Sequence, residues 1–246
     1  MKYRRCAFVM ASALLAVFAL SSTASADFFF KMVNNTDAVQ MMGQTQPATS
    51  DTSSIWLTDG KSCMTSPDGN SYLFIEKDNK AYFIDRAAKT YAEMPLDLSE
   101  QVADAMEEVE DEEGAEQAAM MKAMTEQMAG SFKITVTPSA ESKKIGDWQA
   151  TKYIMDMTTM MGKMTSELWA TEDIKVDYDA YLSVANGSSM MLPGYEQMLR
   201  EMKKVKGIVV YSVAENAVMG STVRSTMELL EFSEKKAPAG TFDIPE

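Results

Sequence analysis

Between residues 28 and 94 the chain reads as a series of short strands separated by explicit turns. The apolar segments span residues 28–33, 55–57, 72–75, 81–84 and 90–94. Turn residues lie between them at Asp59-Gly60, Pro67–Asn70 and Asp78-Asn79. Strands this close in sequence pair with their neighbours, so the pattern predicts an antiparallel meander. Residues 36–54 are polar and predict a loop or a weak edge strand.

The rest of the chain alternates helical and strand patterns. Residues 98–130 are rich in Ala, Glu, Gln and Met, which predicts helix. The acidic run 107–116 predicts a hinge within it, and residues 117–129 a lid. Strands are expected at 132–136, 148–157, 163–170, 208–213 and 218–232, with a second helical insertion over 176–207. The fold class predicted is α+β: one domain, residues 27–246, with a large curved antiparallel sheet, an open half-barrel, and helices across its concave face.

The first 26 residues predict a cleavable secretory signal peptide. Lys2, Arg4 and Arg5 precede an apolar run from Ala7 to Leu20, and residues 24–26 form an A-x-A cleavage site. The run is shorter than a membrane span of about 20 residues. Cleavage after Ala26 would remove Cys6, so a lipoprotein anchor is not expected. We therefore expect a periplasmic protein with no permanent membrane anchor.

Composition argues against most enzymatic and nucleic-acid functions. The chain has no histidine, which removes the commonest general base and metal ligand. Residues 1–26 hold three of the 23 basic and none of the 36 acidic residues, so the mature chain has a net charge of −16. Such a surface repels nucleic acid. The S-x-x-K match at Ser233–Lys236 lacks its companion motifs. We expect no enzyme, no catalytic residue and no cofactor.

The chain contains 23 methionines, which allow three interpretations. They could fill irregular gaps in a core, or line an adaptable groove for apolar ligands, because thioethers repack around different shapes. They could also bind Cu(I) or scavenge oxidants, since thioethers are soft ligands. The residues of that metal-binding alternative are Met155, Met157, Met160, Met161 and Met164.

Three segments resemble a family of exported bacterial proteins, a domain of unknown function that is itself similar to the LolA/LolB-like lipoprotein carriers. They are Ile145–Tyr153, Thr165–Thr171 and Ala237–Pro245. The resemblance implies a curved, partly open β-barrel with helices across its mouth, and it provides no catalytic residues. Ala150 stands where the family pattern suggests a cysteine, which removes a possible disulfide partner for Cys63.

The function predicted is a non-enzymatic carrier that holds a lipid, an acyl chain or a lipoprotein between sheet and helices. An envelope protein is a possible partner. A methionine-rich copper or oxidant-scavenging protein and an interaction module without ligand are the alternatives. The expected groove residues are Phe30, Met32, Trp56, Phe74, Tyr153, Met155, Met157, Trp169, Met124 and Met128.

Overall fold

The computed structural model describes most of the chain after residue 26. The described residues are 27–41, 44–78, 80–94, 131–159, 162–176, 194–218 and 221–245, with residues 120, 123, 178, 181 and 182. The acidic hinge at 107–116 and almost all of the predicted lid lie outside them. Residues 120 and 123 are helical, and the side chain of Met120 is exposed.

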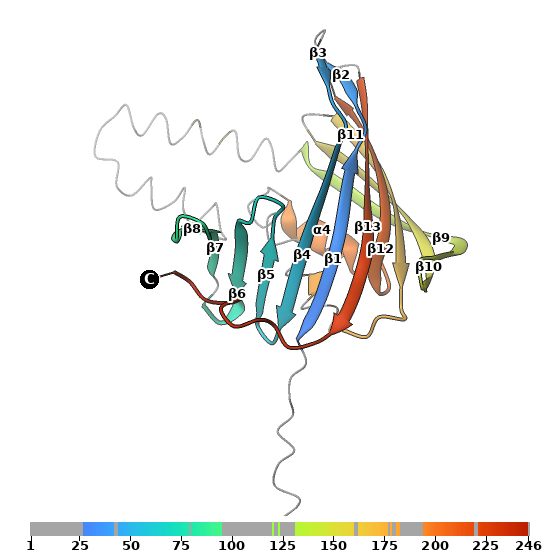
Figure 1. Ribbon diagram of the computed structural model, residues 1–246. Coiled ribbons are helices and arrows are strands. Elements are labelled where there is room, and N and C mark those ends of the chain that lie inside the picture. Colours follow the sequence, from blue (N-terminus) through green and yellow to red (C-terminus); the bar gives the residue numbers. More distant parts are fainter. Residues whose placement is uncertain are drawn as a thin grey trace, which may run out of the picture.

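Eleven strands form one antiparallel sheet, in the order β8-β7-β6-β5-β4-β1-β13-β12-β11-β10-β9. A hairpin of β2 and β3 extends one end of it (Figure 1). The strand bounds are β1 Phe28–Thr36, β2 Val39–Met41, β3 Gln44–Gln46, β4 Thr49–Thr58, β5 Lys61–Thr65, β6 Ser71–Ile75, β7 Lys80–Asp85, β8 Thr90–Met94, β9 Lys133–Ile145, β10 Trp148–Thr159, β11 Gly162–Thr171, β12 Ile208–Val218 and β13 Ser221–Glu234. Short 3-10 helix η1 spans Glu76–Asp78.

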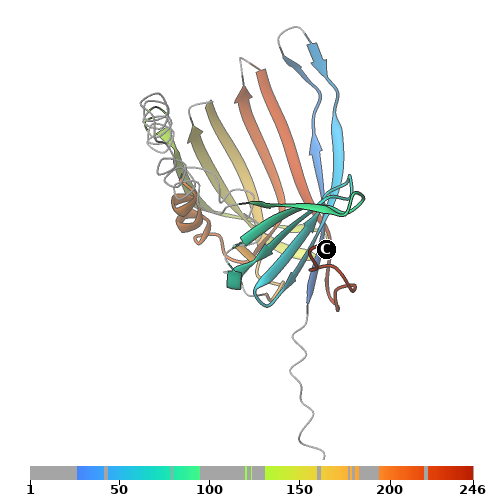
Figure 2. The ribbon, with the colours of Figure 1, turned by 90° about the vertical axis from the view of Figure 1, so that its left-hand side faces the viewer.

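The sheet is strongly curved and unclosed, with β8 and β9 as its edge strands (Figure 2). The large antiparallel sheet expected from the sequence is thus confirmed. The prediction for residues 36–54 is wrong, because β4 begins at Thr49 and lies in the middle of the sheet. Its first half is built from Ser, Thr and Asp and is exposed, so apolar patterning could not mark it as a strand.

Strand register gives the sheet two distinct faces. Phe28, Phe30 and Met32 share one face, which we call the inner face, while Phe29 and Lys31 lie on the other, the outer face. The inner face continues to the far side of the sheet through the paired residues Asn34, Met227, Ser212, Leu168 and Tyr153.

Helix α4, Tyr195–Met202, packs on the inner face near β9 and β10 (Figure 2). Met202 and the following Val205 join a cluster with Val136, Tyr153, Leu168, Ala170 and Val209. α4 covers only part of the helical insertion predicted over 176–207, and Gly207 ends the turn after it with φ +87°. The expected covering of the whole face by helices is not shown. No helix of the described residues is long and apolar enough to cross a membrane.

The C-terminal segment 235–245 runs back along the outer face of β5–β7 (Figure 1). Phe242 and Ile244 pack against the buried side chains of Cys63, Leu73, Ile75, Tyr82 and Ile84. Arg86 holds this segment: its guanidinium donates to the carbonyl oxygens of Gly240, Thr241 and Asp243 at 3.3, 3.0 and 3.0 Å. Burial raises the pKa of the Cys63 thiol, although Arg86 opposes that effect.

Candidate ligand-binding face

The part of the inner face formed by β1 and β4–β7, which we call the lower half, carries aromatic and aliphatic side chains. One row of paired residues contains Phe30, Ile55, Met64, Tyr72 and Phe83. The neighbouring row contains Phe28, Leu57, Ser62, Phe74 and Ala81. Tyr72 and Phe83 are half-buried, with ring centroids 5.2 Å apart. Phe28 and Met64 are half-buried as well, whereas the other apolar side chains of the two rows are buried.

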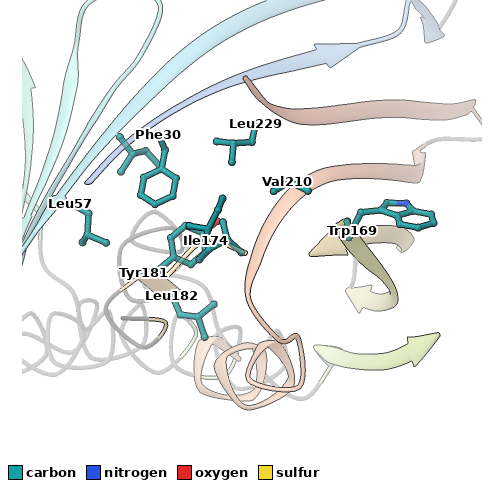
Figure 3. Close-up of a cluster of buried hydrophobic side chains, with 11 residues drawn as sticks. Phe30, Leu57, Trp169, Ile174, Tyr181, Leu182, Val210 and Leu229 are labelled. Carbon is teal, nitrogen blue, oxygen red and sulfur yellow. The ribbon is translucent and has the colours of Figure 1, made fainter. Parts of the chain in front are cut away.

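Tyr181 packs onto this surface from the segment between β11 and α4. Its ring centroid lies 5.6 Å from that of Phe30, and both belong to a buried cluster that also contains Ile174, Leu182 and Leu229 (Figure 3). The neighbouring Tyr178 donates its hydroxyl hydrogen to the carbonyl oxygen of Met202 at 3.0 Å. This segment is thereby tied to α4.

Methionines gather on the inner face of β10 and β11. Met157 lies directly opposite Met164, and Met155 points to the same face two residues earlier. All three are half-buried. Next to them, the Tyr153 hydroxyl accepts the Lys206 backbone N–H at 3.1 Å, which anchors the chain after α4 to the sheet.

The structure brings six of the predicted groove residues onto the inner face: Phe30, Met32, Phe74, Tyr153, Met155 and Met157. Phe30, Phe74 and Tyr153 are buried, and the three methionines are half-buried. Met124 and Met128 lie outside the described residues, as do Met160 and Met161 of the metal-binding alternative. The alternation expected for Phe28–Val33 and for Tyr153–Met157 is confirmed.

Trp56 and Trp169 occupy outer-face positions in their strands, although Trp169 belongs to the same buried cluster as Phe30 and Tyr181. The ring centroid of Trp56 lies 4.7 Å from that of Phe29, and Lys235 covers the Phe29 ring at 3.9 Å. Trp169 is 5 % exposed beneath Lys143, whose Nζ lies 3.8 Å from the ring centroid. Figure 3 shows the Trp169 ring away from Phe30 and Tyr181, beyond Val210. Two-residue alternation along each strand decides this placement.

Several inner-face residues were not predicted from the sequence. They are Met64, Tyr72, Phe83, Met227 and Tyr181. Tyr72 could have been found, because it lies two residues before Phe74 in the same strand. Tyr181 gives no such signal, because its contact with Phe30 joins residues 151 positions apart outside any strand pairing.

Charged side chains of the sheet form ion pairs on the outer face. Lys152 Nζ lies 2.8 Å from Glu167 Oε1, and this pairing lowers the pKa of the Glu167 carboxyl. At the β9 edge, Glu201 of α4 accepts the Val136 backbone N–H at 2.7 Å. The pKa of the Glu201 carboxyl is lowered, chiefly by its hydrogen bond to Lys204 and also by this backbone N–H.

Among the residues described, no group of three or more His, Cys, Asp or Glu side chains could hold a metal ion.

Burial of Tyr181 leads to a prediction about the stability of the fold at alkaline pH. Burial raises its pKa from 10.0 to about 12, so the folded state favours the neutral phenol. Its contribution is complete below pH 10 and is lost as the pH rises from 10 towards 12, by about 3 kcal/mol in total. In urea titrations between pH 8 and pH 12, Tyr181→Phe should lose less stability than the parent. Tyr91→Phe, at a side chain 51 % exposed, is the control and should follow the parent.

Comparison with known proteins assigns no family to this chain. No family model matches the sequence, and no curated protein matches it significantly. Two crystal forms of PNGF-II are similar in structure, with 13 % and 12 % identity and a TM-score of 0.38; the matches cover 87 % and 89 % of this chain. The chain spans only about 29–30 % of PNGF-II. A domain from Vibrio parahaemolyticus, named as a candidate outer membrane lipoprotein-sorting protein, has 6 % identity and a TM-score of 0.31 over 87 % of this chain and 88 % of its own. Similarities this low do not define a function.

Proposed function

We propose that this protein is a non-enzymatic carrier in the periplasm that holds the apolar part of an amphiphile on the inner face of its sheet. The ligand classes are a lipid, an acyl chain or a lipoprotein. The observation that carries the proposal is the band of half-buried aromatic and methionine side chains across the inner face, from β7 to β10. In this proposal α4 covers one side of the ligand.

The chemistry of the band suits an acyl chain. Each methylene group that leaves water contributes about 0.8 kcal/mol, so a chain of ten methylenes provides up to about 8 kcal/mol before the costs of ordering. Met155, Met157 and Met227 have flexible side chains that adapt to chains of different length. Tyr72 and Phe83 give flat apolar contacts at the other end of the band.

The double substitution Met155→Gln with Met157→Gln should weaken binding of the apolar fluorophore N-phenylnaphthylamine by about tenfold or more. Glutamine is similar in length to methionine but costs free energy where it displaces apolar contact. Binding is measured by fluorescence titration of the protein after its natural ligand has been removed. Ile154→Gln is the matched control, because Ile154 lies between the two methionines on the outer face.

Equal loss in the control would show that the effect is a general destabilisation, and the absence of any loss would contradict a ligand site at β10.

Native mass spectrometry of protein purified from the periplasm is the complementary measurement. A lipid-mass adduct that disappears on denaturation supports the carrier. A bare polypeptide mass without an adduct opposes it.

Copper handling is a second candidate because Met155, Met157 and Met164 share one face, with Met157 and Met164 paired directly. Three thioethers in this arrangement are suitable soft ligands for Cu(I). Replacing all three by leucine retains the apolar volume and removes the sulfur atoms. Leucine variants that still bind N-phenylnaphthylamine but no longer retain Cu(I) against a chelator would support metal handling. Unchanged Cu(I) retention would exclude these methionines.

A further inference from the structure

Basic side chains are unevenly distributed between the two faces of the sheet. The strands carry nine Lys and Arg residues, and register places eight of them on the outer face: Lys31, Lys61, Lys80, Lys133, Lys143, Lys152, Lys163 and Arg224. Register places the ninth, Lys144, on the inner face, where it pairs with Gln149 next to the β9–β10 turn at the tip of that hairpin. On the strands of the inner face, the aromatic and methionine band therefore has no basic side chain beside it.

Apart from Lys144, the few charges on the inner face of the strands are acidic. Asp51 and Glu234 are exposed near opposite ends of their strands, and Asp85 accepts the Ala88 backbone N–H at 2.7 Å. Beside the sheet, α4 and the residues after it carry the exposed Arg200, Lys203, Lys204 and Lys206, of which Lys204 pairs with Glu201 at 2.6 Å. Among the described strand residues, the inner face is therefore neutral to acidic apart from Lys144 at the hairpin tip.

Polarity also changes along the strands of this face. Towards the β2–β3 end, a row of paired residues contains Ser166, Ala214, Ser225, Thr36 and Thr49 beside Met155. Towards the other end the inner face carries Phe28, Phe30 and Leu57. Hydroxyl groups can donate and accept hydrogen bonds to ester, amide or hydroxyl groups of a ligand. They do not compensate the desolvation of a full negative charge.

Resting on the carrier function proposed above, we propose that the ligand is an amphiphile with an uncharged polar part, such as a glycerol ester or an amide. The chain lies along the aromatic and methionine band. The polar part lies at the Ser225–Thr36 end of the face. Anionic amphiphiles, such as fatty acids, are discriminated against because the strands offer them no basic partner beside the aromatic and methionine band.

The test compares two ligands that share one chain. Hexadecanoylglycerol and hexadecanoate each displace N-phenylnaphthylamine from the protein at pH 8, below their aggregation concentrations. We expect hexadecanoylglycerol to bind at least about tenfold more tightly. The titration is repeated at about 1 M salt, where the Debye length is about 3 Å and repulsion by the net charge is screened. The preference should persist there, because it depends on desolvation of the carboxylate.

A matched pair of variants locates the discrimination. Ser225→Lys adds a positive charge to the inner face and should raise hexadecanoate affinity about tenfold. Thr226→Lys adds the same charge one residue later, on the outer face, and should leave both affinities within about twofold. Thr36→Lys, which is paired with Ser225 across β1 and β13, serves as a second inner-face variant if Ser225→Lys does not fold.

The outcomes separate the two proposals. If the parent binds N-phenylnaphthylamine and hexadecanoate binds as tightly as hexadecanoylglycerol at both salt concentrations, the uncharged-ligand proposal is overturned and the carrier function stands. An equal gain in hexadecanoate affinity from Ser225→Lys and Thr226→Lys also overturns it, because the effect would not depend on the face. If neither the fluorophore nor either amphiphile binds, the carrier function itself fails.

Discussion

Replacement of Gly207 by alanine is expected to lower the free energy of unfolding by about 4 kcal/mol. Gly207 has φ +87°, a conformation that costs an alanine about 1–2 kcal/mol. A Cβ at this position would lie 1.9 Å from the Thr171 carbonyl oxygen and 2.5 Å from its carbonyl carbon. Backbone atoms at the end of β11 cannot rotate away, so overpacking adds about 1–3 kcal/mol. Equilibrium urea denaturation followed by circular dichroism measures the change.

Gly69→Ala is the control that separates the two causes of this loss. Gly69 has φ +86°, but no heavy atom lies within 4 Å of the position of its Cβ. This variant should lose only about 1–2 kcal/mol, because it carries the backbone strain without the clash. Equal losses in the two variants would contradict the close approach of Gly207 to β11. They would also contradict the tight packing of the connection between α4 and β12 against the end of β11.

Substitution of Arg86 by leucine is expected to release the C-terminal segment 235–245 and to cost about 3 kcal/mol. The guanidinium hydrogen-bonds three carbonyl oxygens of that segment and Ser71 Oγ at 3.2 Å. Hydrogen bonds to a charged group contribute about 1.5–3 kcal/mol each, and solvent replaces part of that when the segment detaches. Release also uncovers Cys63, which is 1 % exposed. The rate at which a thiol reagent modifies Cys63 should therefore rise by at least about tenfold.

Arg224→Leu is the matched control for this prediction. Arg224 pairs with Asp37 at 3.7 Å with both side chains largely exposed, and such pairs contribute little. Its thiol reactivity should equal that of the parent. A slow, parent-like reaction of Cys63 in Arg86→Leu would show that Phe242 and Ile244 hold the segment without the arginine.

The meander β4–β8 could be predicted from the sequence because apolar runs and turn residues alternate clearly there. The long strands β12 and β13 were predicted in outline, since residues 208–213 and 218–232 contain the apolar part of each. The first half of β4 could not be predicted, because Ser and Thr residues exposed on both faces have no alternation to detect. Its place in the sheet is decided by pairing with β1, a long-range contact.

Only part of the candidate face could be predicted, because alternation acts within a single strand. Local alternation correctly grouped Phe28 with Phe30 and Tyr153 with Met155, because both pairs lie within one strand. It could not decide which face of one strand joins which face of another. Trp56 and Trp169 show this limit, since both occupy outer-face positions that only register reveals.

The strand order has a consequence for the order of folding. β1, the first strand, pairs with β13, the last, so that Phe30 lies opposite Phe232. Contacts between residues so distant in sequence form slowly, because a long loop must close first. Until β13 is present, β1 with β4–β8 and β12 with β9–β11 have no strand to join them. Each would expose an unpaired backbone edge, the kind of surface on which chains associate wrongly. Pairing of β13 with both β1 and β12 therefore joins two aggregation-prone half-sheets into one sheet.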